Sequence, residues 1–166
     1  MNQVCFEHID KSEFENILPQ MFAILYANMS VIAPTGNSYE SDFQMWVSHI
    51  LPALKEEYRE TILFYITGEL VGFFRYSLNN DVQLLLLEDI QIKPEFQGKG
   101  LFSSCLKWLV NQLPKSIFGV AAYVDKRNIR SCAIMEHFGL KCIGENKNGI
   151  SFYMMGDFAV FCNMFS

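Results

Sequence analysis

Residues 90–101 read Ile-Gln-Ile-Lys-Pro-Glu-Phe-Gln-Gly-Lys-Gly-Leu, and this stretch decides the fold of the 166-residue chain. An apolar strand runs through a proline turn into two glycines, which open a helix. Gly98 and Gly100 remove side chains where an anion would approach the main chain, and the amides and positive dipole end of the helix would attract it. The stretch therefore predicts a phosphate-binding turn, and a phosphate-bearing cofactor is the first hypothesis.

The length and composition predict one domain over residues 1–166 with a substantial hydrophobic core. Hydrophobic residues make up 51% of the chain and charged residues 19%, which is typical of a globular protein. The net charge of -5 and the lack of a lysine or arginine cluster argue against a nucleic-acid partner. No apolar run approaches the ~20 residues that span a bilayer, so we expect no membrane segment.

The cysteines and histidines predict neither disulfides nor a metal site. The five cysteines are odd in number, scattered and without C-x-x-C spacing, which favours reduced thiols. The three histidines lack the spacing of metal ligands. Because the N-terminus has no basic region followed by an apolar stretch, we expect no secretory signal and a cytoplasmic location.

The first 60 residues predict one strand and two helices. Residues 3–8 alternate as in an edge strand, and Asp10 with Glu13 predicts a helix start of the capping-box kind. After a cluster of turn formers, a second helix is expected to begin at Ser41 or Asp42.

From residue 61 the hydrophobic period changes to that of strands. Residues 61–66 and 70–76 predict a hairpin, and residues 82–92 predict a long third strand antiparallel to it. The same reasoning predicts helices over 101–110 and 129–138 and strands over 117–124, 140–144 and 150–155.

The element order β-α-α-β-β-β-α-β-α-β-β, with a glycine turn after the central strand, resembles that of the GNAT superfamily of acetyl-CoA-dependent N-acetyltransferases. The resemblance spans nearly the whole chain. Its strongest part is the family's pyrophosphate motif, Arg or Gln, two residues, Gly, one residue, Gly or Ala, which corresponds here to residues 97–102 with Phe102 in the last position. The resemblance implies an α+β GNAT fold, with a mixed, mostly antiparallel sheet of six to seven strands and about four helices.

Two rival phosphate motifs are absent from this turn. A P-loop needs Gly-Lys followed by Ser or Thr, and a dinucleotide fingerprint needs a third Gly or Ala three residues after the second Gly. Here Leu101 follows Gly100, and position 103 is Ser103.

A second motif agrees with the family. Asn128 opens a helix, and Gly139 ends it before Leu140. Seven residues after the Asn, the family commonly places a Tyr that protonates the coenzyme A thiolate, and this chain has Met135, which cannot donate a proton. The resemblance leaves that role to Tyr123, to Ser131, to Cys132 or to solvent.

The resemblance also implies which residues bind acetyl-CoA. Main-chain groups of the central strand would hold the pantetheine arm and thioester, the glycine turn would hold the pyrophosphate, and the second motif would reach the arm from the other side. These residues are Ile90, Gln91, Ile92, Gln97, Gly98, Lys99, Gly100, Leu101, Phe102, Asn128 and Ser131.

Two carboxylates, Glu88 and Asp89, interrupt the apolar central strand, where a charge is costly unless it is paired or wet. Adjacent strand residues face opposite sides, so one of the two can face the acceptor. Glu88 is the expected general base, because family members often carry a carboxylate near this point. The structural alternative is that both carboxylates form salt bridges with Arg75 or Lys93.

The implied reaction is direct transfer of acetyl to a primary amine of a small molecule. In the family the acceptor usually lies between the first two helices and a late hairpin, so residues 30–39 are expected to set specificity. Two alternatives stay open: acetylation of a protein Lys or N-terminus, and a module that binds acyl-CoA as a sensor without turnover. The apolar tail, residues 158–165, predicts a subunit interface, such as that of a homodimer, or a strand tucked against the sheet.

Overall fold

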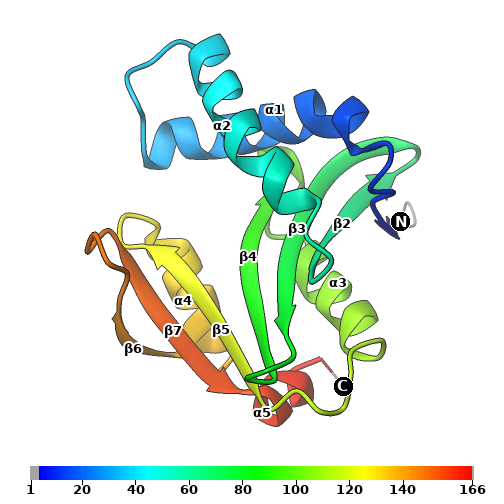
Figure 1. Cartoon of the computed structure of the whole chain (residues 1–166), viewed down its shortest axis with the longest axis vertical. Helices are drawn as coiled ribbons and strands as arrows, with labels where there is room; N and C mark the ends of the chain where they lie inside the picture. The colour runs from blue at the N-terminus through cyan, green and yellow to red at the C-terminus, as the bar shows by residue number, and fades with distance from the viewer. Residues whose placement is uncertain (1–3, 166) are drawn as a thin grey trace. The chain divides into compact units, whose positions relative to one another are not determined.

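The computed structural model describes residues 4–165, and its strands form one mixed sheet in the order β1-β2-β3-β4-β5-β7-β6 (Figure 1). The strands are β1 (Val4–His8), β2 (Arg59–Ile66), β3 (Glu69–Asn79), β4 (Leu84–Ile92), β5 (Gly119–Asp125), β6 (Lys141–Glu145) and β7 (Ser151–Asp157). The helices are α1 (Phe14–Ile32), α2 (Tyr39–Leu54), α3 (Leu101–Val110), α4 (Ile129–His137) and α5 (Phe158–Asn163), with a 3-10 turn η1 (Pro94–Phe96). The fold class agrees with the prediction, and so does the order of the strands and helices up to β7, whereas α5 was not predicted.

The strands pair as the predicted mixed sheet requires. β4 and β5 are parallel, whereas β1 with β2, β5 with β7 and β6 with β7 are antiparallel. Two residues, Thr67 and Gly68, join β2 to β3 with positive φ angles of 49° and 80°. This left-handed pair gives the twist that a two-residue hairpin needs.

Contacts divide the chain into two compact units. The first contains residues up to 75 together with 89–101, and the second contains 76–88 together with the rest of the chain from 102. Strands β3 and β4 contribute residues to both units.

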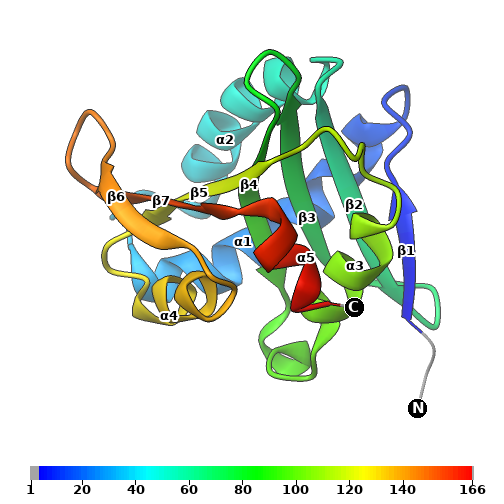
Figure 2. The ribbon, with the colours of Figure 1, turned by 90° about the horizontal axis from the view of Figure 1, so that it is seen from below.

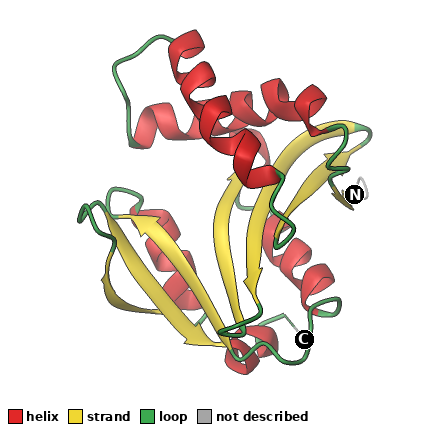
Figure 3. Ribbon diagram, viewed as in Figure 1, coloured by secondary structure: helices red, strands yellow, loops and turns green. Residues whose placement is uncertain are grey.

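In the first unit, α1 and α2 pack against β2 and β3, and a long loop joins the two helices (Figure 3). The amphipathic patterns of both helices supply the apolar face, as expected. The core side chains are Phe14, Leu18, Met21, Ile24, Ile50, Leu54, Leu63, Leu70 and Phe73.

Two predicted helix starts were wrong. Asp10 does not cap α1, because its Oδ1 accepts hydrogen bonds from the amide and hydroxyl of Ser12, and the helix begins at Phe14. α2 begins earlier than predicted, at Tyr39, where the Ser38 hydroxyl accepts from the Ser41 amide at 3.2 Å. The predicted first strand is confirmed from Val4, and Gln3 lies outside the described residues.

In the second unit, α4 and α5 lie on the same face of the strands β5, β7 and β6 (Figure 2). The strand predicted as one alternative for residues 158–165 was wrong, because this tail forms α5 and buries its phenylalanines. Phe161 is fully buried and contacts the rings of Phe138, Phe158 and Phe165 at centroid distances of 6.1, 6.3 and 5.0 Å. The tail therefore gives no support for a homodimer, which stays a prediction.

Candidate active site

The glycine turn of the first unit has the geometry of an anion site. Gly98 and Gly100 have φ angles of 73° and 75°, which L side chains rarely adopt. The space beside the Gly100 Cα is open, since a Cβ there would meet no heavy atom within 4 Å. The main-chain amides of Gly98, Lys99 and Gly100 make no hydrogen bond to any described residue, so they remain available to a ligand.

A positive charge lies next to this turn. The Lys99 ammonium is 5.0 Å from the centroid of the Phe96 ring, which holds the side chain by a cation–π contact. Leu101 then begins α3, whose first amides have no partner within the helix. The turn thus combines free donors, a helix N-terminus and a cation, and these groups fit a pyrophosphate.

An amide network fixes the turn to β4. The side-chain Nε2 of Gln97 donates to Asn28 Oδ1 and to the Ile92 carbonyl, both at 2.9 Å. Asn28 Nδ2 in turn donates to Gln91 Oε1 at 2.9 Å and to the same Ile92 carbonyl at 3.0 Å. Gln97 and Gln91 therefore act through their side chains as supports of the turn and strand.

Part of the main-chain edge of β4 that faces β5 is not paired with it. Its described pairing with β5 covers Leu84–Leu87 and ends there, before the predicted thioester-binding residues 90–92. On the other side, β3 approaches closely, because a Cβ on Gly72 would lie 2.7 Å from the Gln91 carbonyl oxygen. The predicted residues Ile90, Gln91 and Ile92 thus belong to the same unit as the glycine turn.

The two carboxylates of β4 face opposite sides, as the strand period predicts. Asp89 Oδ1 accepts a hydrogen bond at 2.8 Å from Gln91 Nε2, two residues on, so these side chains share a face. Glu88 is half-buried on the opposite face and belongs to the second unit. The expected partner Lys93 instead pairs with Glu69, so the Lys93 part of the salt-bridge alternative was wrong.

The second motif caps α4 in the second unit. Asn128 Oδ1 accepts from the Ser131 amide at 3.1 Å, while its Nδ2 makes no hydrogen bond to a described residue. Just before it, Asp125 accepts three hydrogen bonds from Arg127, and this guanidinium holds the pKa of the Asp125 carboxyl below its usual value. Gly139, with a φ of 88°, ends the helix as predicted.

Phe102 and Met135 mark where the chain departs from the family motifs. The Phe102 ring packs against Phe138 with centroids 5.8 Å apart, so it belongs to the phenylalanine core of the second unit. Met135 is 4% exposed and also part of the core.

The candidate proton donors differ in their surroundings. Burial raises the pKa of the Cys132 thiol, and Glu136 adds to this, so Cys132 is a poor acid near neutral pH. Tyr123 is half-exposed and stacks on Tyr153 with centroids 4.8 Å apart. Ser131 is half-buried beside its cap.

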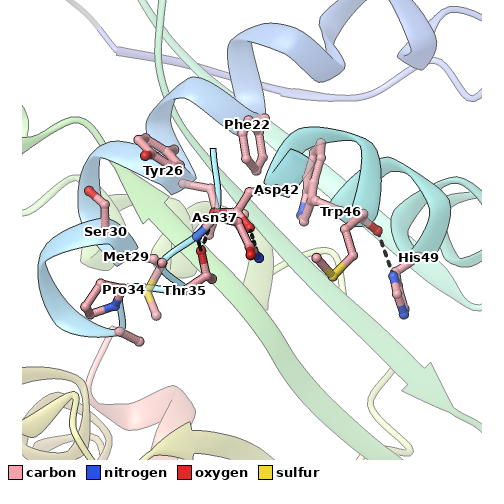
Figure 4. Close-up of a pocket in the computed structure, with 14 residues that line it drawn as sticks. Phe22, Tyr26, Met29, Ser30, Pro34, Thr35, Asn37, Asp42, Trp46 and His49 are labelled. Atoms are coloured by element: carbon pink, nitrogen blue, oxygen red, sulfur yellow. Dashed lines mark hydrogen bonds between the residues drawn. The ribbon is translucent and has the colours of Figure 1, made fainter. Parts of the chain in front are cut away.

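A pocket of about 610 Å³ opens between α1, α2 and the loop that joins them, all within the first unit (Figure 4). The predicted specificity segment, residues 30–39, contributes several of its walls. The lining residues are Phe22, Leu25, Tyr26, Met29, Ser30, Ala33, Pro34, Thr35, Gly36, Asn37, Asp42, Met45, Trp46 and His49.

Sequence reasoning missed Asn28, which lies in α1 one residue before the pocket residue Met29. An asparagine in the last turns of an apolar helix gives no signal of its partners, because these lie 63 to 69 residues further along the chain.

The described residues contain neither a candidate membrane-spanning helix nor a candidate metal-binding cluster. No helix there is both long and apolar enough to cross a membrane. No group of three or more His, Cys, Asp and Glu side chains is placed there to hold a metal ion.

The fold was then compared with known proteins. None of the curated protein sequences compared with this chain matches it. Among solved structures, the PaiA N-acetyltransferase of Thermoplasma acidophilum in complex with coenzyme A has a TM-score of 0.71 and 15% identity, over 93% of this chain and 99% of that chain.

Two further solved structures cover almost the full length. The aminoglycoside acetyltransferase AAC(6′)-Ib in complex with coenzyme A and kanamycin has a TM-score of 0.69 and 17% identity, over 99% of this chain and 100% of that chain. A mutant of the spermidine N-acetyltransferase of Vibrio cholerae has a TM-score of 0.64 and 14% identity, over 99% of both chains. At these identities the similarity shows the shared fold.

A family model provides the link at the level of sequence. The model described as the acetyltransferase (GNAT) family matches residues 18–140, which include most of α1 together with α2, the central strand, the glycine turn and α4. The chain therefore belongs to the acetyltransferase (GNAT) family.

Proposed function

We propose that this protein is an N-acetyltransferase that moves an acetyl group from acetyl-CoA to a primary amine of a small molecule. One observation carries the proposal: the left-handed Gly98 and Gly100 leave amides without partners directly before the N-terminus of α3. Such a turn binds phosphate groups, and family membership makes coenzyme A the phosphate-bearing ligand.

The remaining acetyl-CoA contacts are proposed from the resemblance to the family. The Gln97 amide already donates to the Pro94 carbonyl, so the amides from Gly98 to Phe102 would hold the pyrophosphate. The main chain of Ile90, Gln91 and Ile92 would hold the pantetheine arm and thioester along the edge of β4 that is not paired with β5. The resemblance assigns two further contacts to Asn128, whose Nδ2 makes no hydrogen bond to a described residue, and to Ser131.

The chemistry needs a base and a way to neutralise a thiolate. Acetyl-CoA supplies an activated acetyl group as a thioester. Glu88 would take a proton from the acceptor ammonium, directly or through water. Tyr123, Ser131, Cys132 or solvent would return a proton to the thiolate, and the raised pKa of Cys132 makes it the weakest of these candidates.

The test is release of free coenzyme A thiol from acetyl-CoA in the presence of a panel of amines. The panel contains small primary amines, a lysine-bearing peptide and a peptide with a free N-terminus. Thiol release with a small amine confirms the proposal. Release with a peptide as the best acceptor would replace it with protein acetylation.

A second candidate, an acyl-CoA sensor without turnover, is favoured by Met135. This buried thioether occupies the position at which the family commonly has a proton-donating Tyr. A sensor would bind acetyl-CoA in a calorimeter but release no thiol with any amine of the panel.

We also propose a single cytoplasmic domain without a bound metal. All five cysteines are free thiols, which suits a reducing compartment. Light scattering of the purified chain tests the homodimer prediction.

A further inference from the structure

The pocket between α1 and α2 is lined by the rings of Phe22, Tyr26 and Trp46, and two rings outside the lining, Tyr39 and Phe43, pack against Phe22. The Phe22 ring lies 5.0 Å from Tyr39, 5.2 Å from Phe43 and 5.4 Å from Trp46, measured between centroids. Tyr26 packs on the same cluster, 4.8 Å from Tyr39. Since the rings restrict one another, they give the pocket a preformed apolar wall.

One carboxylate interrupts this apolar lining. Asp42 is the only Asp or Glu among the described residues that line the pocket, and no Lys or Arg lines it. Its Oδ2 accepts from the Thr35 hydroxyl at 2.6 Å, and its Oδ1 accepts from Asn37 Nδ2 at 3.0 Å (Figure 4). Both donors are neutral, so they fix the position of the carboxylate and leave its negative charge uncompensated by the lining.

A histidine ring lines another part of the pocket. His49 Nδ1 lies 2.7 Å from the Met45 carbonyl oxygen, which can only accept, so Nδ1 carries the proton. His49 Nε2 makes no hydrogen bond to a described residue. Asp42 is therefore the one carboxylate that the described lining offers to a cation.

We propose that this pocket binds the part of the acceptor away from the reacting amine, an apolar or aromatic body with a single cationic group that pairs with Asp42. This deepens the proposed acetyl transfer and rests on it. A volume of about 610 Å³ suits a ligand of this size. Binding of a polycation is disfavoured. Its additional charges would lose their hydration against the apolar walls, and the lining offers no second anion to pair with them.

The test is calorimetric binding of unreacted probes to the full chain without acetyl-CoA. The probes are 2-phenylethylammonium, its neutral analogue 2-phenylethanol, and spermidine. Asp42→Asn keeps the side-chain shape and should weaken 2-phenylethylammonium binding about tenfold or more, with 2-phenylethanol affinity unchanged. The matched control is Glu40→Gln, which removes an exposed carboxylate from the same turn of α2 outside the lining and should change neither affinity.

Equal binding of 2-phenylethylammonium to the wild type and Asp42→Asn would overturn the assignment, and so would tighter binding of spermidine. Absence of any 2-phenylethylammonium binding would also overturn it. Thermal stabilisation by acetyl-CoA is measured in parallel, because it does not depend on Asp42. Stabilisation by acetyl-CoA without probe binding rejects the pocket inference alone, whereas loss of both rejects the proposed function as well.

Discussion

Gln97 donates a hydrogen bond from Nε2 to Asn28 Oδ1 across 2.9 Å, and this contact ties the glycine turn to the last turns of α1. The next residue of α1, Met29, lines the pocket between the helices. The first residue of the pyrophosphate motif therefore serves as a structural link, and the main-chain amides that follow it are left to bind the anion.

Replacement of Asn28 should loosen this link. Asn28→Ala leaves Gln91, Gln97 and the Ile92 carbonyl short of partners, so we expect a loss of about 1–3 kcal/mol in the free energy of unfolding. The affinity for acetyl-CoA should fall as well, because the turn is no longer held in place. Urea unfolding and calorimetry measure the two effects.

The control for this change is Asn111→Ala, which removes one exposed hydrogen bond to the Lys107 carbonyl. It should leave both quantities nearly unchanged. If Asn28→Ala behaves like this control, the amide network does not support the turn.

Glu88→Gln should slow acetyl transfer without weakening acetyl-CoA binding. The amide has the shape of the carboxylate but cannot accept the proton, and loss of a general base typically costs about 10²–10⁴-fold in rate. Steady-state kinetics at neutral pH with the best amine of the panel measure kcat. The exposed Glu57→Gln is the control, and a Glu88→Gln enzyme as fast as that control would place the base elsewhere.

The fully buried Cys105 predicts a pH-dependent contribution to stability. Burial raises the pKa of the Cys105 thiol in the folded protein, whereas the unfolded chain releases the proton near pH 8.5–9. The unfolded state thus holds fewer protons above that pH, so the contribution of Cys105 is present below it and is lost as the pH rises.

Cys105→Ala removes this dependence. The wild-type advantage in unfolding free energy over Cys105→Ala should therefore shrink by roughly 1.5 kcal/mol between pH 8 and pH 10. Urea unfolding of both proteins at the two pH values measures it. A constant difference would contradict the buried position of the thiol.

The phenylalanine core of the second unit predicts a large effect at one tail residue. Phe161→Ala removes a ring that contacts three others and should cost about 3–5 kcal/mol in unfolding free energy. Met164→Ala, at a side chain that is 45% exposed on the same tail, should cost well under this amount. Similar losses for the two variants would mean that the tail does not pack as described.

Local patterns predicted the order of elements and the glycine turn, because periodicity and turn chemistry depend on neighbouring residues. The starts of α1 and α2 were harder to predict from the sequence. Several side chains are plausible caps, and the choice among them depends on which one finds a free amide. These are Asp10, Ser38, Ser41 and Asp42. α5 was missed although Asp157 caps it by accepting from the Val160 amide, a signal that the apolar tail obscured.

The residues of the candidate site were likewise only partly predictable from the sequence. The glycine residues could be found from spacing alone, and the family resemblance supplied the remaining contacts. Asn28 and the neutral donors around Asp42 could not be found, because their roles depend on a tertiary arrangement that brings distant residues together.

The central claim is that the glycine turn binds acetyl-CoA, and thermal unfolding with and without saturating acetyl-CoA tests it most directly. A ligand at about 100 times its dissociation constant adds roughly 2.7 kcal/mol of stability, which raises Tm by several degrees in a chain of this size. Gly100→Glu should abolish this rise through bulk and charge repulsion. Gly68→Glu is the matched control, because Gly68 has a similar φ of 80° and open space around it but lies in the β2–β3 turn.

If the glycine turn binds acetyl-CoA, Tm rises for the wild type and for Gly68→Glu but not for Gly100→Glu. No rise for the wild type, or an equal rise for all three proteins, would contradict this claim.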